Sequence, residues 1–217
     1  MSLRFETRIK TEIKKDEKFN LRIISINDNK LVINGEIKGP KDGPYSGGTY
    51  TVEIYITNND YPMVPPEIKF CTRIWHPNIC DKTGLVSINS IIEFWTPMTH
   101  FKDIFTNLEK LLITPMKINI KNDWAFQQLK SNEFLFRGTA SFWNFFYANG
   151  LRYVWNLEEK LAVLVTYTNN QQKSLEFLTA NNWNLEDAFE DFQRNKNSRR
   201  SSNFVTKKSN IDCISDI

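Results

Sequence analysis

The 217-residue sequence predicts an α+β fold, and three observations lead to that class. An amphipathic helical pattern comes first, strand patterns separated by turn residues follow, and further helical patterns complete the chain. Hydrophobic residues make up 41% of the sequence and aromatic residues 13%, which is enough for a packed core. The length allows one domain of ordinary size and a second, small one.

The first expected element is a helix, because Phe5, Ile9 and Ile13 recur four residues apart in "RFETRIKTEIKK", with Arg and Lys between them. Strands rich in β-branched residues follow in "LRIISIND", "KLVINGEIKG" and "GTYTVEIYIT", and Gly, Pro and Asp occupy their connectors. Residues 21–57 are therefore expected to form a meander of three antiparallel strands. The stretch "PPEIKFCTRI" predicts a short fourth strand.

Helical patterns follow the strands. The stretch "HFKDIFTNLEKLLI" places apolar residues on one helical face, and two more helices are expected near 123–131 and 133–147. Residues 1–150 should thus form a core domain with a four-stranded antiparallel sheet and flanking helices. Three short helical patterns within 156–195 predict a small three-helix bundle as a second domain.

The basic residues are concentrated at the end of the chain. The net charge is +3, but the segment from Arg194 onward has six Lys or Arg and two Asp, which leaves about −1 for residues 1–193. The folded part is nearly neutral, so its charge does not indicate a nucleic-acid-binding domain. Residues 196–217 lack apolar periodicity and are predicted to be a disordered basic tail.

The cysteines and the hydropathy argue against a disulfide-rich, secreted or membrane protein. Cys71, Cys80 and Cys213 are irregularly spaced, which argues against a disulfide framework or a zinc site and suits a reducing compartment. No apolar run approaches the roughly 20 residues of a membrane span. The charged start "MSLRFETRIKTEIKK" is unlike a secretory signal. We therefore expect a cytoplasmic protein, with the nucleus as a second location, and no membrane partner.

His76, Pro77 and Asn78 form a polar motif, and Ser87 follows nine residues after Asn78. Together with "GPKDGPYSGGTYTVEIYI", "YPMVPPEIKF", "TRIWHPNI" and "EFWTP", in this order, this motif makes the chain resemble the ubiquitin-conjugating enzymes over roughly residues 5–150. Four motifs in register are far more specific than any one of them. The three helical patterns near the C-terminus are similar to a ubiquitin-associated domain, which one subgroup of the family carries at that end.

The resemblance implies a centre where a cysteine accepts ubiquitin as a thioester and passes it to a lysine, without a cofactor or metal. Ser87 stands at that cysteine's position, and a serine hydroxyl is a far weaker nucleophile unless a base activates it. Asn78 matches an asparagine that steadies the oxyanion, or else a turn asparagine bonded to its own backbone. His76 matches a histidine that mainly supports the turn. Asn119 replaces the second acid of a "DDP" segment that guides the incoming lysine.

The resemblance also implies partner surfaces. The activating enzyme would dock on a basic helix face, which charge alone does not distinguish from a solvated one: Arg8, Lys10, Lys14 and Lys15. A ligase would bind two loop tips: Met63, Pro97 and Met98. A ubiquitin-contacting loop in the C-terminal helices would comprise Tyr167, Thr168 and Asn169. This loop lacks the usual glycine and apolar pair, so packing on the core domain is an equal alternative.

Three functions are compatible with the sequence. The first is a homologue without thioester chemistry that binds ubiquitin or a ubiquitin-like protein, a ligase or an active partner. The second is an active enzyme with an engineered serine at position 87, and the third is an interaction module outside this pathway. The departure at Asn119 favours natural loss of activity, whereas the intact "HPN" motif counts against it. Cys80 is more consistent with a free loop cysteine than with a substitute nucleophile.

Overall fold

The computed structural model describes residues 3–27, 30–57, 61–151 and 156–197. The chain folds into two compact units, Met1–Tyr153 and Val154–Ile217. From residue 198 on, the expected basic tail lies outside the described residues. Within the described ranges, no helix has the length and apolar character that crossing a membrane requires.

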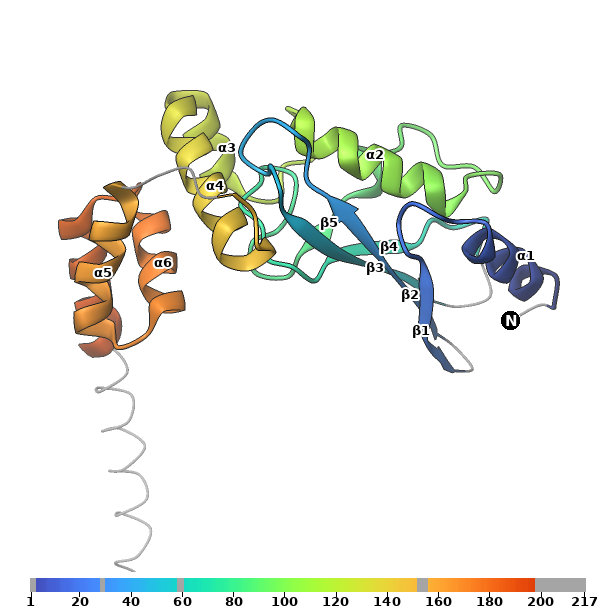
Figure 1. The fold of residues 1–217 in the computed structure, drawn as a ribbon, viewed down its shortest axis with the longest axis horizontal. Helices are drawn as coiled ribbons and strands as arrows, with labels where there is room; N and C mark the ends of the chain where they lie inside the picture. The colour runs from blue at the N-terminus through green and yellow to red at the C-terminus, as the bar shows by residue number, and fades with distance from the viewer. Residues whose placement is uncertain (1–2, 28–29, 58–60, 152–155, 198–217) are drawn as a thin grey trace, which may run out of the picture. The chain divides into compact units, whose positions relative to one another are not determined.

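The first unit is built on an antiparallel sheet in which each strand pairs with the next one along the chain, in the order β1-β2-β3-β4-β5 (Figure 1). Buried and half-buried residues alternate along β3, so one face of the sheet is covered by the core. The expected meander and fourth strand are present. The strands are β1 (Arg22–Asn27), β2 (Lys30–Lys38), β3 (Thr49–Thr57), β4 (Glu67–Phe70) and β5 (Leu85–Val86).

The fifth strand is a difference from the four-stranded sheet that the sequence predicts. β5 has two residues, too few to show a period-2 pattern. It follows Gly84, whose φ is 76°, and a Cβ at Gly84 would lie 1.9 Å from the carbonyl oxygen of Phe70. Two hydrogen bonds close this hairpin: the Cys80 N–H donates to the Leu85 oxygen at 3.1 Å, and the Gly84 N–H to the Cys80 oxygen at 2.8 Å.

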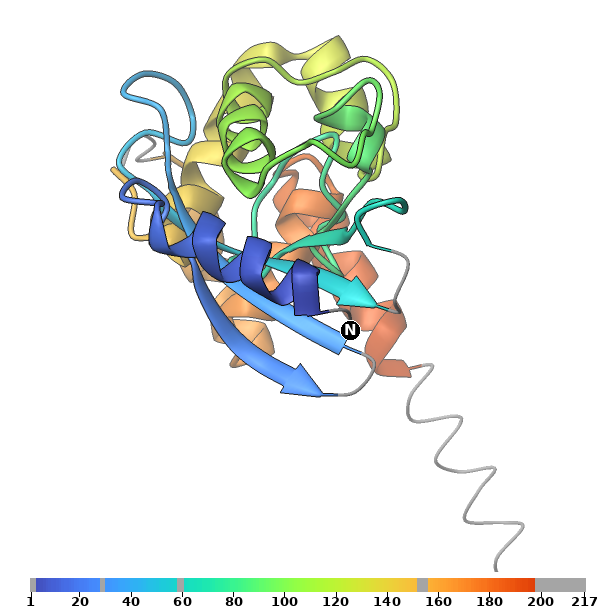
Figure 2. The ribbon, with the colours of Figure 1, turned by 90° about the vertical axis from the view of Figure 1, so that its right-hand side faces the viewer.

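Helices flank this sheet, and α2 lies over it in both views (Figures 1 and 2). Phe105 of α2 packs against Gly35 of β2, where a Cβ would lie 2.4 Å from the ring. This packing fixes α2, whose last turns reach Leu111, an acceptor for the site described below. The helices are α1 (Leu3–Lys14), α2 (Phe101–Ile113), α3 (Asp123–Ser131) and α4 (Glu133–Ala148), and a 3₁₀ turn, η1 (Ile88–Ser90), follows β5.

The second unit contains α5 (Asn156–Thr168), α6 (Gln171–Ala180) and a further helix over 185–197. Asn170 caps α6 by accepting a hydrogen bond from the Lys173 N–H at 2.8 Å. All three helical patterns within 156–195 therefore correspond to helices, and the last one reaches residue 197. Apolar residues from all three helices are buried in this unit: Leu157, Leu161, Leu164, Leu175, Leu178 and Ala188.

Candidate active site

The turn at residues 76–78 is buried, and its histidine is fully bonded. His76 Nε2 donates to the Leu111 carbonyl oxygen at 3.1 Å, and Nδ1 accepts from the Asn78 N–H at 3.1 Å. A carbonyl can only accept and a backbone amide can only donate, so these bonds place the ring proton on Nε2. Burial lowers the pKa of His76 to about 4. At neutral pH the ring is therefore neutral, and both nitrogens are occupied.

The Asn78 side chain links the turn to the segment between α2 and α3. Its Nδ2 donates to the carbonyl oxygens of Met116 and Ile118 at 3.1 and 2.8 Å, and its Oδ1 accepts from the Met116 N–H at 2.9 Å. The Pro77 oxygen also accepts two bonds from this segment, at 2.8 and 3.0 Å. The side-chain amide of Asn78 therefore bonds a distant segment, and not the backbone of its own turn. To steady an oxyanion, it would have to give up one of these bonds.

Ser87 follows β5 directly and lies opposite Asn78. Ile79 and Val86 form an antiparallel bridge, and this register pairs the residue before Ile79 with the residue after Val86. Ser87 is partly exposed, with extended backbone (φ −73°, ψ 131°), and precedes η1 without capping it through its side chain. Among the residues that the structure describes, its hydroxyl has no hydrogen-bond partner.

Cys80 is the nearest thiol in sequence but occupies a different place in the hairpin. Cys80 pairs with Leu85. This pair is two positions along the ladder from Asn78 and Ser87, so it lies roughly 7 Å closer to the hairpin tip at residues 81–84. Burial opposes ionisation of this thiol, but hydrogen bonds from the Thr83 side chain and backbone and from the Lys82 backbone outweigh it and lower the pKa of Cys80. These bonds thus favour the thiolate, but the sulfur lies away from the position that Ser87 occupies.

The segment that Asn78 holds, residues 114–122, lies beside the turn and forms a wall next to it. Asn119 has a φ of 54°, a left-handed conformation that asparagine tolerates well. Residues 114–122 contain no Asp or Glu, and their exposed side chains include Lys117, Ile118 and Lys121. The first acid is Asp123, in the first turn of α3. This wall is therefore apolar and basic, and it offers no carboxylate to an incoming ammonium group.

Two loops with exposed apolar tips are braced against each other. Met63 is 71% exposed and Met98 is 73% exposed, while Pro97 is half-buried. The Trp95 indole donates to the Pro62 carbonyl oxygen at 2.8 Å, and the Tyr61 ring lies against that of Trp95, with 6.2 Å between ring centroids. The structure thus gives the three residues of the expected ligase surface a rigid base. Exposed apolar tips on such a base are typical of a protein contact site.

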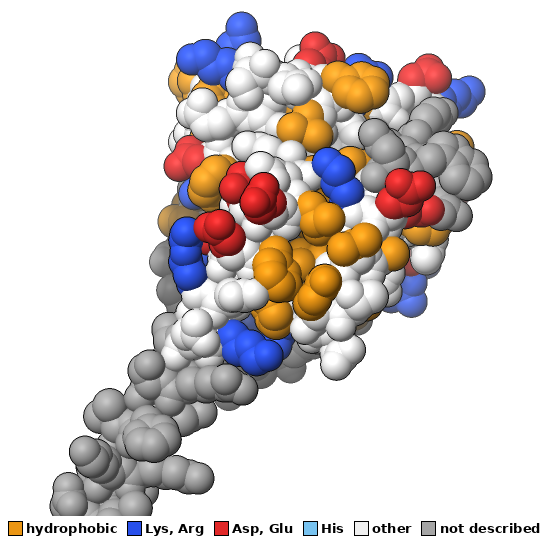
Figure 3. All heavy atoms as spheres, turned by 90° about the vertical axis from the view of Figure 1, so that its left-hand side faces the viewer, with side chains coloured by type: hydrophobic (Ala, Val, Ile, Leu, Met, Phe, Trp, Pro, Cys, Tyr) orange, Lys and Arg blue, Asp and Glu red, His pale blue; other side chains and the backbone are white. Residues whose placement is uncertain are grey.

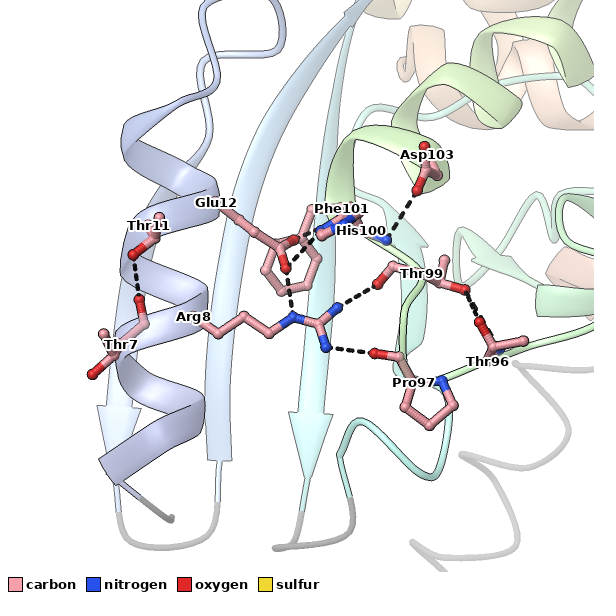
Figure 4. A network of polar contacts seen from close by, with 10 residues as sticks. All are labelled: Thr7, Arg8, Thr11, Glu12, Thr96, Pro97, Thr99, His100, Phe101 and Asp103. Atoms are coloured by element: carbon pink, nitrogen blue, oxygen red, sulfur yellow. Dashed lines mark hydrogen bonds and ion pairs between the residues drawn. The ribbon is translucent and has the colours of Figure 1, made fainter.

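The basic residues expected on the first helix do not share one environment. Lys10, Lys14 and Lys15 are exposed, whereas the Arg8 guanidinium is half-buried and donates to the carbonyl oxygens of Pro97 and Thr99 (Figure 4). Sequence reasoning missed this connection because these partners lie 89 and 91 residues away. It also missed Glu12, whose i,i+4 spacing from Arg8 was the available signal.

In the second unit, the three loop residues also separate. Tyr167 is 57% exposed and belongs to an apolar groove, whereas the Thr168 hydroxyl donates to the Asn170 carbonyl oxygen at 3.0 Å. Asn169 adopts a left-handed φ of 50°. Figure 3 shows hydrophobic side chains gathered on a face of this unit. The groove measures about 430 Å³, and its apolar lining is Val163, Leu164, Tyr167, Leu185 and Phe189.

Neither unit shows a candidate metal centre within its described residues, where no three His, Cys, Asp or Glu side chains gather suitably. What the first unit offers is a surface site. It consists of the buried turn at residues 76–78, the Ser87 hydroxyl opposite this turn, and the segment 114–122, which contains no acid. The loops that carry Met63 and Met98 lie elsewhere in the same unit.

The family model described as "Ubiquitin-conjugating enzyme" matches residues 4–144. "Ubiquitin-conjugating enzyme E2 21" of Caenorhabditis elegans is 32% identical over 169 residues, which cover 77% of this chain and 78% of that protein. "Ubiquitin-conjugating enzyme E2 K" of Homo sapiens is 29% identical over 189 residues, which cover 86% of this chain and 94% of that protein. The solved E2 domain of a Toxoplasma gondii ubiquitin conjugating enzyme superimposes with a TM-score of 0.60 at 28% identity, covering 66% of this chain and 99% of that domain. The chain belongs to the ubiquitin-conjugating enzyme family.

Proposed function

We propose that this chain is a conjugating-enzyme homologue that forms no thioester and acts in ubiquitin transfer by binding other components. One observation carries the proposal: the group at the nucleophile position is the Ser87 hydroxyl, and no base contacts it among the described residues. His76 is neutral, buried and bonded at both nitrogens, so it is not available as that base. An alcohol without a base stays protonated and attacks acyl groups poorly.

The binding surfaces follow from the family and from the exposed groups. Members of the family work with ubiquitin, an activating enzyme and ligases in general. Lys10, Lys14 and Lys15 are exposed for the activating enzyme, while Met63 and Met98 are exposed for a ligase. A ligase held here would be occupied without receiving ubiquitin from Ser87. The chain would therefore act as a scaffold or a competitor for an active family member.

A charging assay tests the proposal. The chain is incubated with ubiquitin, ATP and an activating enzyme from the same organism, and the adducts are separated with and without thiol reductant. We expect no reducible adduct, and any slow adduct should resist reductant and be cleaved by mild base, as an oxyester on Ser87 would be. Ser87→Cys should restore a reducible adduct.

Two control variants make this assay decisive. Ser87→Ala should abolish the base-labile adduct, and Cys80→Ala should change nothing. A reducible adduct that survives Ser87→Ala and disappears with Cys80→Ala would show instead that Cys80 is a working nucleophile. If Ser87→Cys stays folded but never charges, docking of the activating enzyme is lost too, and binding to ligase or ubiquitin alone is the remaining role. If the chain binds none of these components, it works outside the pathway.

The second candidate function is an active enzyme carrying an engineered serine, and the intact 76–78 turn favours it. The two candidates differ in the fate of a restored thioester. An engineered trap should, as Ser87→Cys, discharge to lysine like an ordinary family member. Natural loss predicts slow discharge, because residues 114–122 contain no acid. The native codon at position 87 distinguishes the two directly.

We also propose that the second unit is a ubiquitin-associated-like domain and that its apolar groove binds ubiquitin. The alignment with human E2 K covers 86% of this chain, more than residues 1–153 alone can supply, so it extends into the second unit. Titration of isotope-labelled ubiquitin with the full chain should shift ubiquitin resonances. Val163→Glu, in the groove, should remove the part of the shifts that the second unit causes, whereas Ala162→Glu, exposed beside it, should not. Equal spectra for both variants would leave packing as the role of this unit.

A further inference from the structure

A polar network joins α1 to the loop that precedes α2. Arg8 and Glu12, one helical turn apart, pair through Arg8 Nε and Glu12 Oε1 at 2.7 Å (Figure 4). Arg8 then donates to the carbonyl oxygen of Pro97 and, at 2.9 Å, to that of Thr99. Glu12 accepts the N–H of Phe101 at 3.1 Å. The network therefore holds the backbone on both sides of Met98 and the first residue of α2.

Met98 needs this support because its own side chain packs little. It is 73% exposed, so its direction is set by the loop backbone and not by neighbouring side chains. A guanidinium is a planar fork that can serve two acceptors at once, and here it serves two carbonyls that flank one residue. The side chains of Arg8 and Glu12 are only 24% and 13% exposed, so solvent competes weakly for these bonds.

Glu12 also holds the other side of the loop. Its Oε1 lies 3.0 Å from His100 Nδ1, and the His100 N–H donates to the Asp103 carboxylate at 3.0 Å. A groove of about 710 Å³ runs between α1 and the start of α2, and Arg8, Glu12 and Met98 all line it. The network and the exposed methionine therefore belong to one surface.

We infer that Arg8 and Glu12 are positioning residues for the ligase-facing loop, and that Arg8 does not belong with the lysines that face the activating enzyme. The inference rests on the proposed function only for the identity of the partners. Its structural part concerns the chain alone: removing either residue releases Met98 while leaving the rest of the first unit in place.

Methyl NMR on the full chain tests the structural part without any partner. The sequence has four methionines, and Met63, Met98 and Met116 are described by the structure. With ¹³C-methyl methionine, Glu12→Gln should shift and narrow the Met98 signal. Met63, in the neighbouring loop, and Met116, bonded to Asn78, should stay in place. Arg8→Ala should do the same, and Lys14→Ala is the matched control on the exposed face.

Two outcomes would overturn the inference at this stage. An unchanged Met98 signal in both variants would show that the loop holds itself. Simultaneous changes in Met63 and Met116 would show general destabilisation in place of local positioning. Hydrogen exchange at the Phe101 amide gives an independent check, since its acceptor is Glu12, and it should become about tenfold faster in Glu12→Gln if the network is a real restraint.

The functional part is tested by separating two activities in the Ser87→Cys background. Glu12→Gln should leave charging by the activating enzyme within about twofold, yet weaken binding of a ligase domain about tenfold, a loss expected of a hydrogen bond to a charged group. Lys14→Ala with Lys15→Ala should do the reverse. A residue that acts through Met98 should lose its effect on ligase binding once Met98→Ala is present, whereas an independent contact would add to it. Equal losses in charging and ligase binding would refute the assignment.

Discussion

The turn at residues 76–78 and Ser87 lie opposite each other in the same hairpin, yet they differ in burial and in hydrogen bonding. The turn is buried, and the side chains of His76 and Asn78 together take part in five hydrogen bonds. Ser87 is partly exposed, and its hydroxyl has no partner among the described residues. The first region holds the structure together, and the second carries the group that would react.

This difference explains how a family motif can persist where its chemistry is absent. The Asn78 side chain ties its turn to residues 38 and 40 positions along the chain, so replacing it leaves three part-buried backbone groups without their partner. Stability is a sufficient reason to keep the motif. The intact "HPN" sequence is therefore weaker support for activity than it is when read from the sequence alone.

Asn78→Ala should lower the free energy of unfolding by roughly 3 kcal/mol, because three part-buried hydrogen bonds to the backbone are lost together. Urea unfolding at neutral pH, followed by tryptophan fluorescence, measures this change. Asn119→Gly is the control, since glycine tolerates the same left-handed φ. Equal stability of Asn78→Ala and the wild-type chain would remove the stability argument for the motif.

Acidification should destabilise the fold through His76. Its pKa is lowered to about 4 in the folded state, so between pH 6.5 and 4 the unfolded chain binds more protons and stability falls as the pH falls. At pH 5 the loss should be about 2 kcal/mol relative to pH 7.5. Comparing His76→Gln with the wild type isolates this contribution. A pH dependence that is the same in both would show that the ring is not buried as neutral imidazole.

In the Ser87→Cys background, Asn119→Asp should speed discharge of ubiquitin to free lysine by roughly tenfold, because a carboxylate can attract and deprotonate the incoming amine. Charging should change less than discharge. Asn119→Gly keeps the backbone conformation without the charge and should leave discharge slow. The decisive measurement is single-turnover loss of the thioester. Fast discharge before any change at position 119 would mean that this wall is already competent.

Ser87→Ala should change the free energy of unfolding by less than about 0.5 kcal/mol, since the hydroxyl makes no bond among the described residues. The comparison of Asn78→Ala with Ser87→Ala, measured under the same conditions, is the sharpest form of the contrast. A destabilisation of Ser87→Ala comparable to that of Asn78→Ala would show that this side chain has a structural role.

The sequence predicted the elements that have a period and missed the features that depend on distant backbone. The meander of residues 21–57 and the helix containing Phe101–Ile113 follow from alternation and from an apolar face, and both are confirmed. β5 is too short for a pattern and depends on Gly84 fitting beneath Phe70. The register of the hairpin that carries Ser87 is set by the Ile79–Val86 bridge, which no local sequence pattern marks.

Partner carbonyls are a second class of feature that the sequence does not encode locally. The sequence groups Arg8 with the exposed lysines of a basic helix, but its acceptors are the backbone oxygens of Pro97 and Thr99. Any residue type can supply such an oxygen, so no side-chain pattern marks it. The same holds for Asn78, whose amide bonds the backbone of residues 116 and 118.

The hairpin that ends at Gly84 also offers a place where the chain can change length. The hydrogen bonds between Cys80, Gly84 and Leu85 close the ladder before its tip, so residues 81–83 lie outside it. Extra residues between Asp81 and Lys82 would extend the tip without shifting the Asn78–Ser87 register. Gly84 cannot be included, because the Phe70 carbonyl leaves no room for a side chain there. Natural variants with longer tips, or a reporter peptide inserted by design, should therefore keep Asn78 and Ser87 opposite each other while the tip of the hairpin differs.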